Sequence, residues 1–109
     1  MKITLSDIGD VKVASLEGRI DLSQTDKLDS FFQKQFGHGN NSFIADLTAV
    51  AFISSDGLAA LMSLRKKCAK LGGTLRLVCP PGLVREVFDV TRMATLFDIS
   101  DTLEEALSK

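Results

Sequence analysis

Side chains that could perform chemistry are few and scattered in this chain. His38 is the only histidine, and the composition of residues 37–41 around it is typical of a loop. Cys68 falls on the apolar stripe of a predicted helix, and Cys79 ends a predicted strand with no adjoining cation to lower its pKa. No cluster of metal ligands or phosphate-binding glycine loop is present. We therefore predict no catalytic residue, metal site or cofactor; the enzymatic alternative would use Cys79 or His38.

A run of small polar residues is the most distinctive feature of the sequence. Ser54, Ser55, Asp56 and Gly57 follow an apolar segment and directly precede a predicted helix. Serine, aspartate and glycine are all favoured at a helix N-terminus, but a helix has only one N-cap residue. Capping therefore explains one of the three polar side chains. Two interpretations stay open on the residues alone: a helix cap, or a functional loop at the start of a helix.

The N-terminal third of the chain predicts a hairpin and a helix. Apolar and polar residues alternate between residues 3 and 13 around a turn-like segment at residues 7–10, so we expect a hairpin whose first strand lies at a sheet edge. Ser23 and Asp26 resemble a capping box, which predicts that an amphipathic helix begins near them and ends at Gly37.

The rest of the chain alternates strands with helices. Residues 43–45 form a short apolar run typical of a central strand, and we expect residues 46–58 to join it to a helix that begins at about Gly57. Later elements are expected as a strand at 74–78, a helix after the Pro-Pro-Gly break at 80–82 and a short helix near 101–107. This order implies an α/β fold: one mainly parallel mixed sheet with an antiparallel N-terminal edge strand and helices packed on it.

The bulk composition indicates a small cytoplasmic protein. A chain of 109 residues suits a single domain, which we place at residues 1–109. Thirteen basic and fourteen acidic residues give a formal net charge of -1, so we expect neither nucleic acid nor a membrane as a partner. The N-terminus does not resemble a secretory signal, and the two cysteines do not resemble a disulfide framework, as expected for a reduced cytoplasmic domain.

The polar run and its surroundings resemble the STAS domains of bacterial anti-sigma factor antagonists. In that family Asp-Leu and a short linker precede an aromatic-aliphatic-Asp-Ser-Ser/Thr-Gly-Leu motif, and residues 46–58 of this chain follow the same order. Residues 18–21, Gly-Arg-Ile-Asp, resemble the family's Gly-x-Leu/Ile-Asp segment. Weaker matches follow in the family's order at residues 72–73, 87–88 and 103–106. The resemblance covers nearly the whole chain.

This resemblance implies a switchable protein-binding module. Ser55 matches the serine that an anti-sigma factor, itself an ATP-dependent serine kinase, phosphorylates; Ser54 is a rival acceptor. The unphosphorylated antagonist would bind that kinase and free the sigma factor, and a PP2C-type phosphatase would remove the phosphate. Asp21 matches a partner-contacting acidic residue. We therefore predict a partner-binding surface made of Asp21, Ser54, Ser55, Asp56 and Gly57.

Three residues depart from the family's pattern. Ser54 replaces an aspartate, Asp56 replaces a serine or threonine, and a glycine is replaced around Arg92. Asp56 places a fixed negative charge beside Ser55. We expect its carboxylate to turn inward and cap the helix; the alternative is that it faces the partner and repels the phosphates of ATP. Asp56 also favours an alternative function, a STAS-like scaffold or binding module that docks a partner without being phosphorylated.

Overall fold

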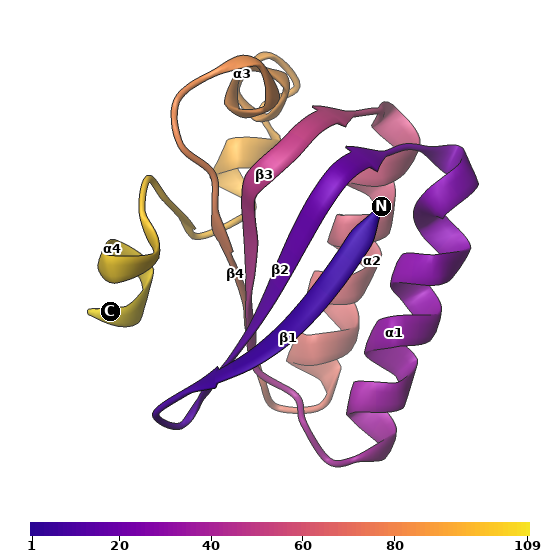
Figure 1. Ribbon diagram of the computed structural model, residues 1–109, viewed down its shortest axis with the longest axis vertical. Coiled ribbons are helices and arrows are strands. Elements are labelled where there is room, and N and C mark those ends of the chain that lie inside the picture. Colours follow the sequence, from indigo (N-terminus) through magenta and orange to yellow (C-terminus); the bar gives the residue numbers. More distant parts are fainter.

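A five-stranded sheet with the strand order β1-β2-β3-β4-β5 lies at the centre of the computed structural model, which describes residues 1–109 (Figure 1). The strands are β1 (Lys2–Ile8), β2 (Val11–Ile20), β3 (Phe43–Ile53), β4 (Leu75–Val78) and β5 (Ile99–Ser100). The helices are α1 (Thr25–Gly37), α2 (Ser55–Lys70), α3 (Leu83–Val90) and α4 (Leu103–Leu107), with 3-10 turns η1 (Leu22–Gln24) and η2 (Met93–Thr95). Only the β1–β2 pair is antiparallel, so the predicted α/β fold with an antiparallel edge strand is confirmed.

Helices cover both faces of the sheet, with α1 and α2 on one face and α4 on the other (Figure 1). Val13 and Ile44 form a small cluster with Ala106 of α4. Their neighbours Ala14 and Ala45 belong to the larger core on the opposite face. Successive residues of a strand point to opposite faces, so β2 and β3 must be apolar on both. This two-sided burial is why apolar and polar residues do not alternate cleanly along β2.

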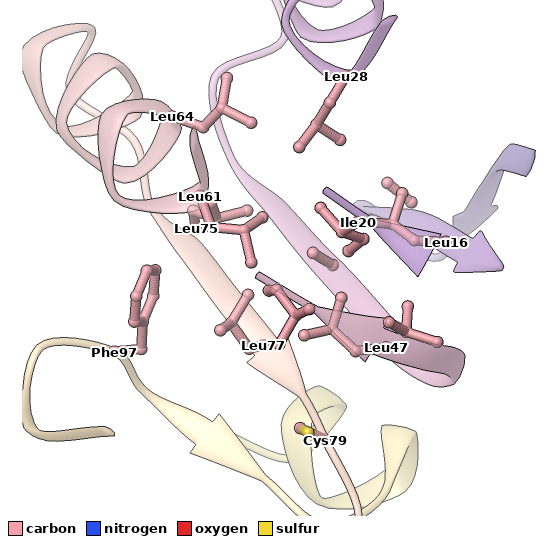
Figure 2. Close-up of a cluster of buried hydrophobic side chains, with 14 of the residues drawn as sticks. Leu16, Ile20, Leu28, Leu47, Leu61, Leu64, Leu75, Leu77, Cys79 and Phe97 are labelled. Carbon is pink, nitrogen blue, oxygen red and sulfur yellow. The ribbon is translucent and has the colours of Figure 1, made fainter. Parts of the chain in front are cut away.

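The larger core lies between the sheet and the helices α1 and α2. Leu28 of α1, Leu64 of α2 and Ile20 of β2 belong to this one cluster, which Figure 2 shows, and each of the three is at most 2% exposed. Phe32 and Phe43 meet edge to face with ring centroids 5.1 Å apart. Burying each such side chain contributes about 1.5–3 kcal/mol. The core therefore holds α2, and with it the start of that helix, rigidly against the sheet.

The third strand is longer than its apolar run predicts. Residues 46–53, which we expected to be part of a connection, continue β3 to Ile53 because β2 pairs with them. The register shifts twice along this stretch, and Asp46 marks the first shift by accepting a hydrogen bond of 2.9 Å from the backbone N–H of Thr48. Each β-bulge moves the following side chains to the other face of the strand. The bulges therefore remove the alternation that would have predicted the strand.

The predicted capping box at Ser23 and Asp26 is wrong. α1 begins at Thr25, and its N-cap residue Gln24 makes no side-chain capping bond. Asp21 instead caps the preceding turn η1 by accepting a hydrogen bond from the backbone N–H of Ser23. The Ser23 hydroxyl donates to Asp21, and its oxygen accepts no backbone N–H of α1.

Arg92 is the only residue other than glycine with a positive φ, at 61°. It ends the turn after α3 and leads the chain into η2. A left-handed conformation costs a non-glycine residue about 1–2 kcal/mol. The family's glycine, which is replaced around Arg92 in this chain, would adopt this turn without strain.

Candidate functional site

The predicted site residues lie together at the carboxyl ends of β2 and β3. Ile20 and Ile53 are the last paired residues of these parallel strands, and the backbone N–H of Ser54 donates to the Ile20 carbonyl at 3.0 Å. Asp21 follows β2, and the run that starts at Ser54 follows β3. Ligands of open α/β sheets commonly bind outside the carboxyl ends of the strands. The fold therefore places one short polar surface, which includes Asp21, at such an edge.

Ser54 is the N-cap residue of α2. Its backbone is extended (φ -91°, ψ 172°), and its hydroxyl oxygen accepts a hydrogen bond of 3.1 Å from the backbone N–H of Gly57. The same hydroxyl lies 3.5 Å from the carbonyl oxygen of Ile20, and the residue is half-buried. Such a cap contributes about 1 kcal/mol. The hydroxyl of Ser54 is therefore already engaged in structure.

Ser55 is the first residue of α2, and it is exposed. Its hydroxyl makes no hydrogen bond, in contrast to that of Ser54. The first N–H groups of a helix have no partner within the helix, and the positive end of the helix dipole favours an anion beside them. The hydroxyl of Ser55 is thus accessible, and a negative charge added to it would be tolerated by the fold.

The expectation that Asp56 caps α2 is wrong, because Ser54 occupies the N-cap position. An N-cap side chain reaches the free N–H groups from an extended residue that precedes the helix. Asp56 is the second helical residue, so its side chain points away from the axis, and it is exposed. It forms no ion pair. Its unpaired charge therefore faces solvent directly beside Ser55.

Asp21 has a structural role of its own. One of its carboxylate oxygens accepts hydrogen bonds from the backbone N–H and the hydroxyl of Ser23, at 3.1 Å and 2.5 Å. The other lies 3.6 Å from Nε of Arg19. The hydrogen bond from the Ser23 side chain is the largest cause that lowers the pKa of Asp21, and Arg19 adds to it. Asp21 is consequently ionised at neutral pH, and 30% of its side chain is exposed.

Gly57 is buried and allows α2 to approach β2 closely. A Cβ atom added to it would lie 2.4 Å from the carbonyl oxygen of Ile20 and 2.9 Å from side-chain atoms of Ile20 and Ile53. No real Cβ atom approaches a backbone oxygen so closely, which explains why this residue has no side chain. Gly57 therefore supports the site through packing, and its contribution to partner contact stays a prediction.

The other reactive side chains lie apart from this surface. His38 is the exposed C-cap residue of α1, whereas Cys68 and Cys79 are buried free thiols. Burial raises the pKa of Cys68 to about 11 and also raises that of Cys79. A thiol with a raised pKa is a poor nucleophile because it is rarely ionised. Contrary to the expectation of no adjoining cation, Arg85 lies beside Cys79 and lowers its pKa, but burial outweighs this effect.

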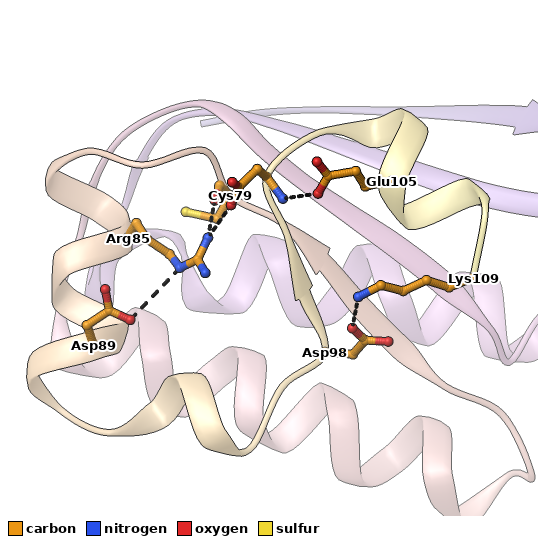
Figure 3. Close-up of polar contacts among 7 residues, drawn as sticks. Cys79, Arg85, Asp89, Asp98, Glu105 and Lys109 are labelled. Atoms are coloured by element: carbon orange, nitrogen blue, oxygen red, sulfur yellow. Dashed lines mark hydrogen bonds and ion pairs between the residues drawn. The ribbon is translucent and has the colours of Figure 1, made fainter.

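Arg85 organises the chain beside Cys79 (Figure 3). Its guanidinium donates to the carbonyl oxygen of Cys79 at 2.8 Å and to the carboxylate of Asp101 at 2.9 Å. A second carboxylate, that of Asp89, lies 3.9 Å from Nε. These contacts tie α3 to the end of β4 and to the loop before α4. The Arg85 contacts therefore stabilise the loops on either side of it. No group of three or more His, Cys, Asp or Glu side chains in the structure could hold a metal ion.

The fold and the site define a small α/β domain with a free serine hydroxyl at the start of a helix, beside the carboxyl ends of two parallel strands. The chain belongs to the STAS domain family, whose model matches residues 2–106. None of its helices has the length and apolar character that crossing a membrane requires.

Individual relatives cover almost the whole chain. A protein of Bordetella bronchiseptica, the putative anti-sigma factor antagonist BtrV, is 27% identical over 97% of this chain and 91% of its own length. The crystal structure of an anti-sigma factor antagonist from Mycobacterium paratuberculosis superposes with a TM-score of 0.87 at 26% identity, covering 98% of this chain and 91% of that one. The phosphorylated form of the Bacillus cell fate determinant SpoIIAA shares the fold (TM-score 0.72, 18% identity, 98% and 97% coverage).

Proposed function

We propose that this chain is an anti-sigma factor antagonist whose unphosphorylated form binds an anti-sigma factor with serine kinase activity and which phosphorylation of Ser55 releases. The observation that carries the proposal is the contrast between two adjacent hydroxyls: that of Ser54 caps α2, whereas that of Ser55 is exposed and free. The names of the Bordetella and Mycobacterium relatives support the first part of the proposal, that the chain is an anti-sigma factor antagonist. A PP2C-type phosphatase would restore the binding form.

The position of Ser55 explains how such a switch operates without unfolding. A phosphate there would meet the unpartnered N–H groups at the start of α2, which attract anions. It would also add about -1.5 to -2 charge to a surface that a partner must desolvate. The unpaired carboxylate of Asp56 already places a negative charge on this surface, whereas Asp21 is paired with Arg19. The effect of the phosphate therefore falls on the partner and leaves the fold intact.

A second candidate function is a STAS-like scaffold that binds its partner without being phosphorylated. The exposed carboxylate of Asp56 favours it, because a fixed charge beside Ser55 opposes the approach of ATP phosphates and imitates part of the phosphate's charge.

Phosphate mapping separates these functions. We expect intact mass spectrometry to show one added phosphate after incubation with the anti-sigma factor kinase and Mg-ATP, both for the unchanged chain and for Ser54→Ala. Ser55→Ala should gain none. Ser54→Ala is the matched control because it removes the neighbouring hydroxyl at a cost of about 1 kcal/mol from the lost cap. Partner binding with no phosphate on any form would favour the scaffold, and a phosphate on Ser54 would refute the assignment of Ser55.

Substitution of Asp56 should strengthen the switch. Because Asp56 is exposed and does not cap α2, Asp56→Ser should raise the initial phosphorylation rate several-fold and widen the affinity gap between the two forms. Salt should reduce the gain, since the repulsion acts between exposed charges. Asp10→Ser removes the same charge from the exposed β1–β2 turn at the opposite end of the sheet (Figure 1), and its rate should equal that of the unchanged chain. If Asp56→Ser and Asp10→Ser are phosphorylated at the same initial rate, the charge of Asp56 does not affect the reaction with the kinase.

Asp21 should contribute to partner binding through its charge. Asp21→Asn keeps an oxygen that can accept from the Ser23 N–H but removes the carboxylate's negative charge. We expect about a tenfold loss in affinity for the anti-sigma factor, measured by titration, with little change in the thermal melt. Asp21→Ala serves as the comparison, since it also removes the cap of η1 and should cost a further 0.5–2 kcal/mol or so of stability. If Asp21→Asn binds normally while Asp21→Ala loses affinity in proportion to its loss of stability, Asp21 acts only by capping η1.

A further inference from the structure

An apolar groove runs between the end of β3 and the helix α3. We call it the β3–α3 groove, and it encloses about 400 Å³. Its apolar lining consists of Ala51, Phe52 and Ile53 from the strand and Leu83, Val84, Val87 and Val90 from the helix. Only two other residues line it, Glu86 and Thr91. A groove with so few polar groups suits the apolar side chains of a protein partner better than a polar small molecule.

Three of the apolar side chains that border this groove are unusually exposed for their type. Val90 is 83% exposed and Leu83 is 76% exposed, more than any other large hydrophobic residue of the chain. Phe52, on the opposite wall, is 40% exposed. Clustered exposed apolar residues mark interaction surfaces, whereas isolated ones need no explanation. The fold thus leaves both walls of the groove uncovered.

The groove exists because β3 extends beyond its neighbour. β4 pairs with β3 only as far as Asp46, so residues 47–53 have β2 on one side and no strand on the other. α3 lies next to this part of β3 in Figure 1, and its buried residues Val84 and Phe88 anchor it to the core. Both walls are therefore parts of regular elements, and the groove is preformed.

The groove is continuous with the surface around Ser55. Phe52 lines it two residues before the helix cap Ser54, and the guanidinium of Arg19 lies 4.3 Å from the centre of the Phe52 ring. Arg19 also pairs with Asp21, at 3.6 Å. A cation held between an aromatic ring and a carboxylate fixes both in place. One rigid surface thus extends from Asp21 and Ser55 to the groove.

The polar residues around Ser55 are too few to form an interface by themselves. A stable interface buries roughly 800 Å² on each partner and has an apolar core with a polar rim. The site around Ser55 offers polar side chains and the buried Gly57, which suits a rim. The adjoining groove offers the missing apolar core.

We propose that the β3–α3 groove receives an apolar anchor of the anti-sigma factor, a partner that rests on the function proposed above. Phe52, Leu83 and Val90 contact the anchor. Glu86 is exposed on the rim and, like Asp56, has no ion-pair partner, so basic residues flank the anchor on the partner. Phosphorylation of Ser55 then acts at the edge of this apolar contact, where added charge must be desolvated when the anchor is seated.

Substitutions on the exposed wall test this proposal. We expect Val90→Lys and Leu83→Ser each to weaken binding of the unphosphorylated chain to the purified anti-sigma factor kinase by about tenfold to a hundredfold. Both side chains are largely in solvent, so thermal melts should match that of the unchanged chain. Leu71→Lys is the control, because Leu71 is 52% exposed at the far end of α2, and it should bind normally.

The outcomes distinguish failure of this inference from failure of the proposed function. If the unchanged chain binds the kinase and is phosphorylated on Ser55 while both groove variants bind equally well, the groove is not the docking site. The same conclusion follows if the variants alter only self-association in sedimentation, which would make a second copy the occupant, or if Leu71→Lys weakens binding equally. If the unchanged chain neither binds nor accepts phosphate, the proposed function fails and this inference fails with it.

Discussion

Phosphorylation of Ser55 is expected to weaken binding to the anti-sigma factor on the order of a hundredfold and to leave the melting temperature nearly unchanged. An unpaired charge of about -1.5 to -2 on a desolvated surface costs roughly 2–5 kcal/mol, and each 1.4 kcal/mol or so is a tenfold change in affinity. The positive end of the α2 dipole lies beside Ser55 and stabilises a negative charge there. The free energy of unfolding should therefore change by at most about 1–2 kcal/mol.

Titrations and thermal melts of the two forms measure both parts of this expectation. The unmodified chain and the form phosphorylated on Ser55 are titrated against the same preparation of the anti-sigma factor. Treatment with a PP2C-type phosphatase should restore the original affinity, which controls for damage during phosphorylation. Equal affinities accompanied by a collapsed melting temperature would show that the phosphate acts on the fold and would overturn the mechanism.

Gly57→Ala should destabilise the protein by about 1–3 kcal/mol and slow phosphorylation of Ser55. The new Cβ atom would lie 2.4 Å from the carbonyl oxygen of Ile20, so the start of α2 must move away from β2. That carbonyl also accepts the 3.0 Å hydrogen bond from Ser54, and the movement would strain it. The displacement would carry the hydroxyl of Ser55 with it.

Urea denaturation and initial phosphorylation rates measure the two effects. Gly37→Ala is the matched control, because Gly37 ends α1 with a negative φ and a Cβ atom added to it has nothing within 4 Å. Alanine favours a helix over glycine by up to about 1 kcal/mol, so Gly37→Ala should be at least as stable as the unchanged chain. If the urea midpoint of Gly57→Ala equals that of the unchanged chain, α2 can move away from β2 without loss of stability. The close approach of α2 to β2 would then not be needed for stability.

The sequence alone was sufficient to predict the α/β class, the edge hairpin and the polar run before α2. These features depend on local signals: apolar periodicity, turn residues and helix-breaking glycines, all of which act within a few neighbours. The family motif likewise led to the prediction of Ser55 and Asp21 as site residues from their immediate sequence context, and their roles stay predictions. β5 was missed because a strand of two residues is too short to show any periodicity.

Tertiary structure decided which residue performs which task at the site. Ser54, Ser55 and Asp56 are all acceptable near a helix N-terminus, so local propensity cannot choose the cap. Pairing of β2 with the bulged half of β3 extends that strand to Ile53, and Ser54 then bonds to Ile20 and takes the cap position. The same contact leaves Ser55 and Asp56 exposed. Long-range pairing is therefore what makes one serine structural and its neighbour available, because it sets where the strand ends and the helix begins.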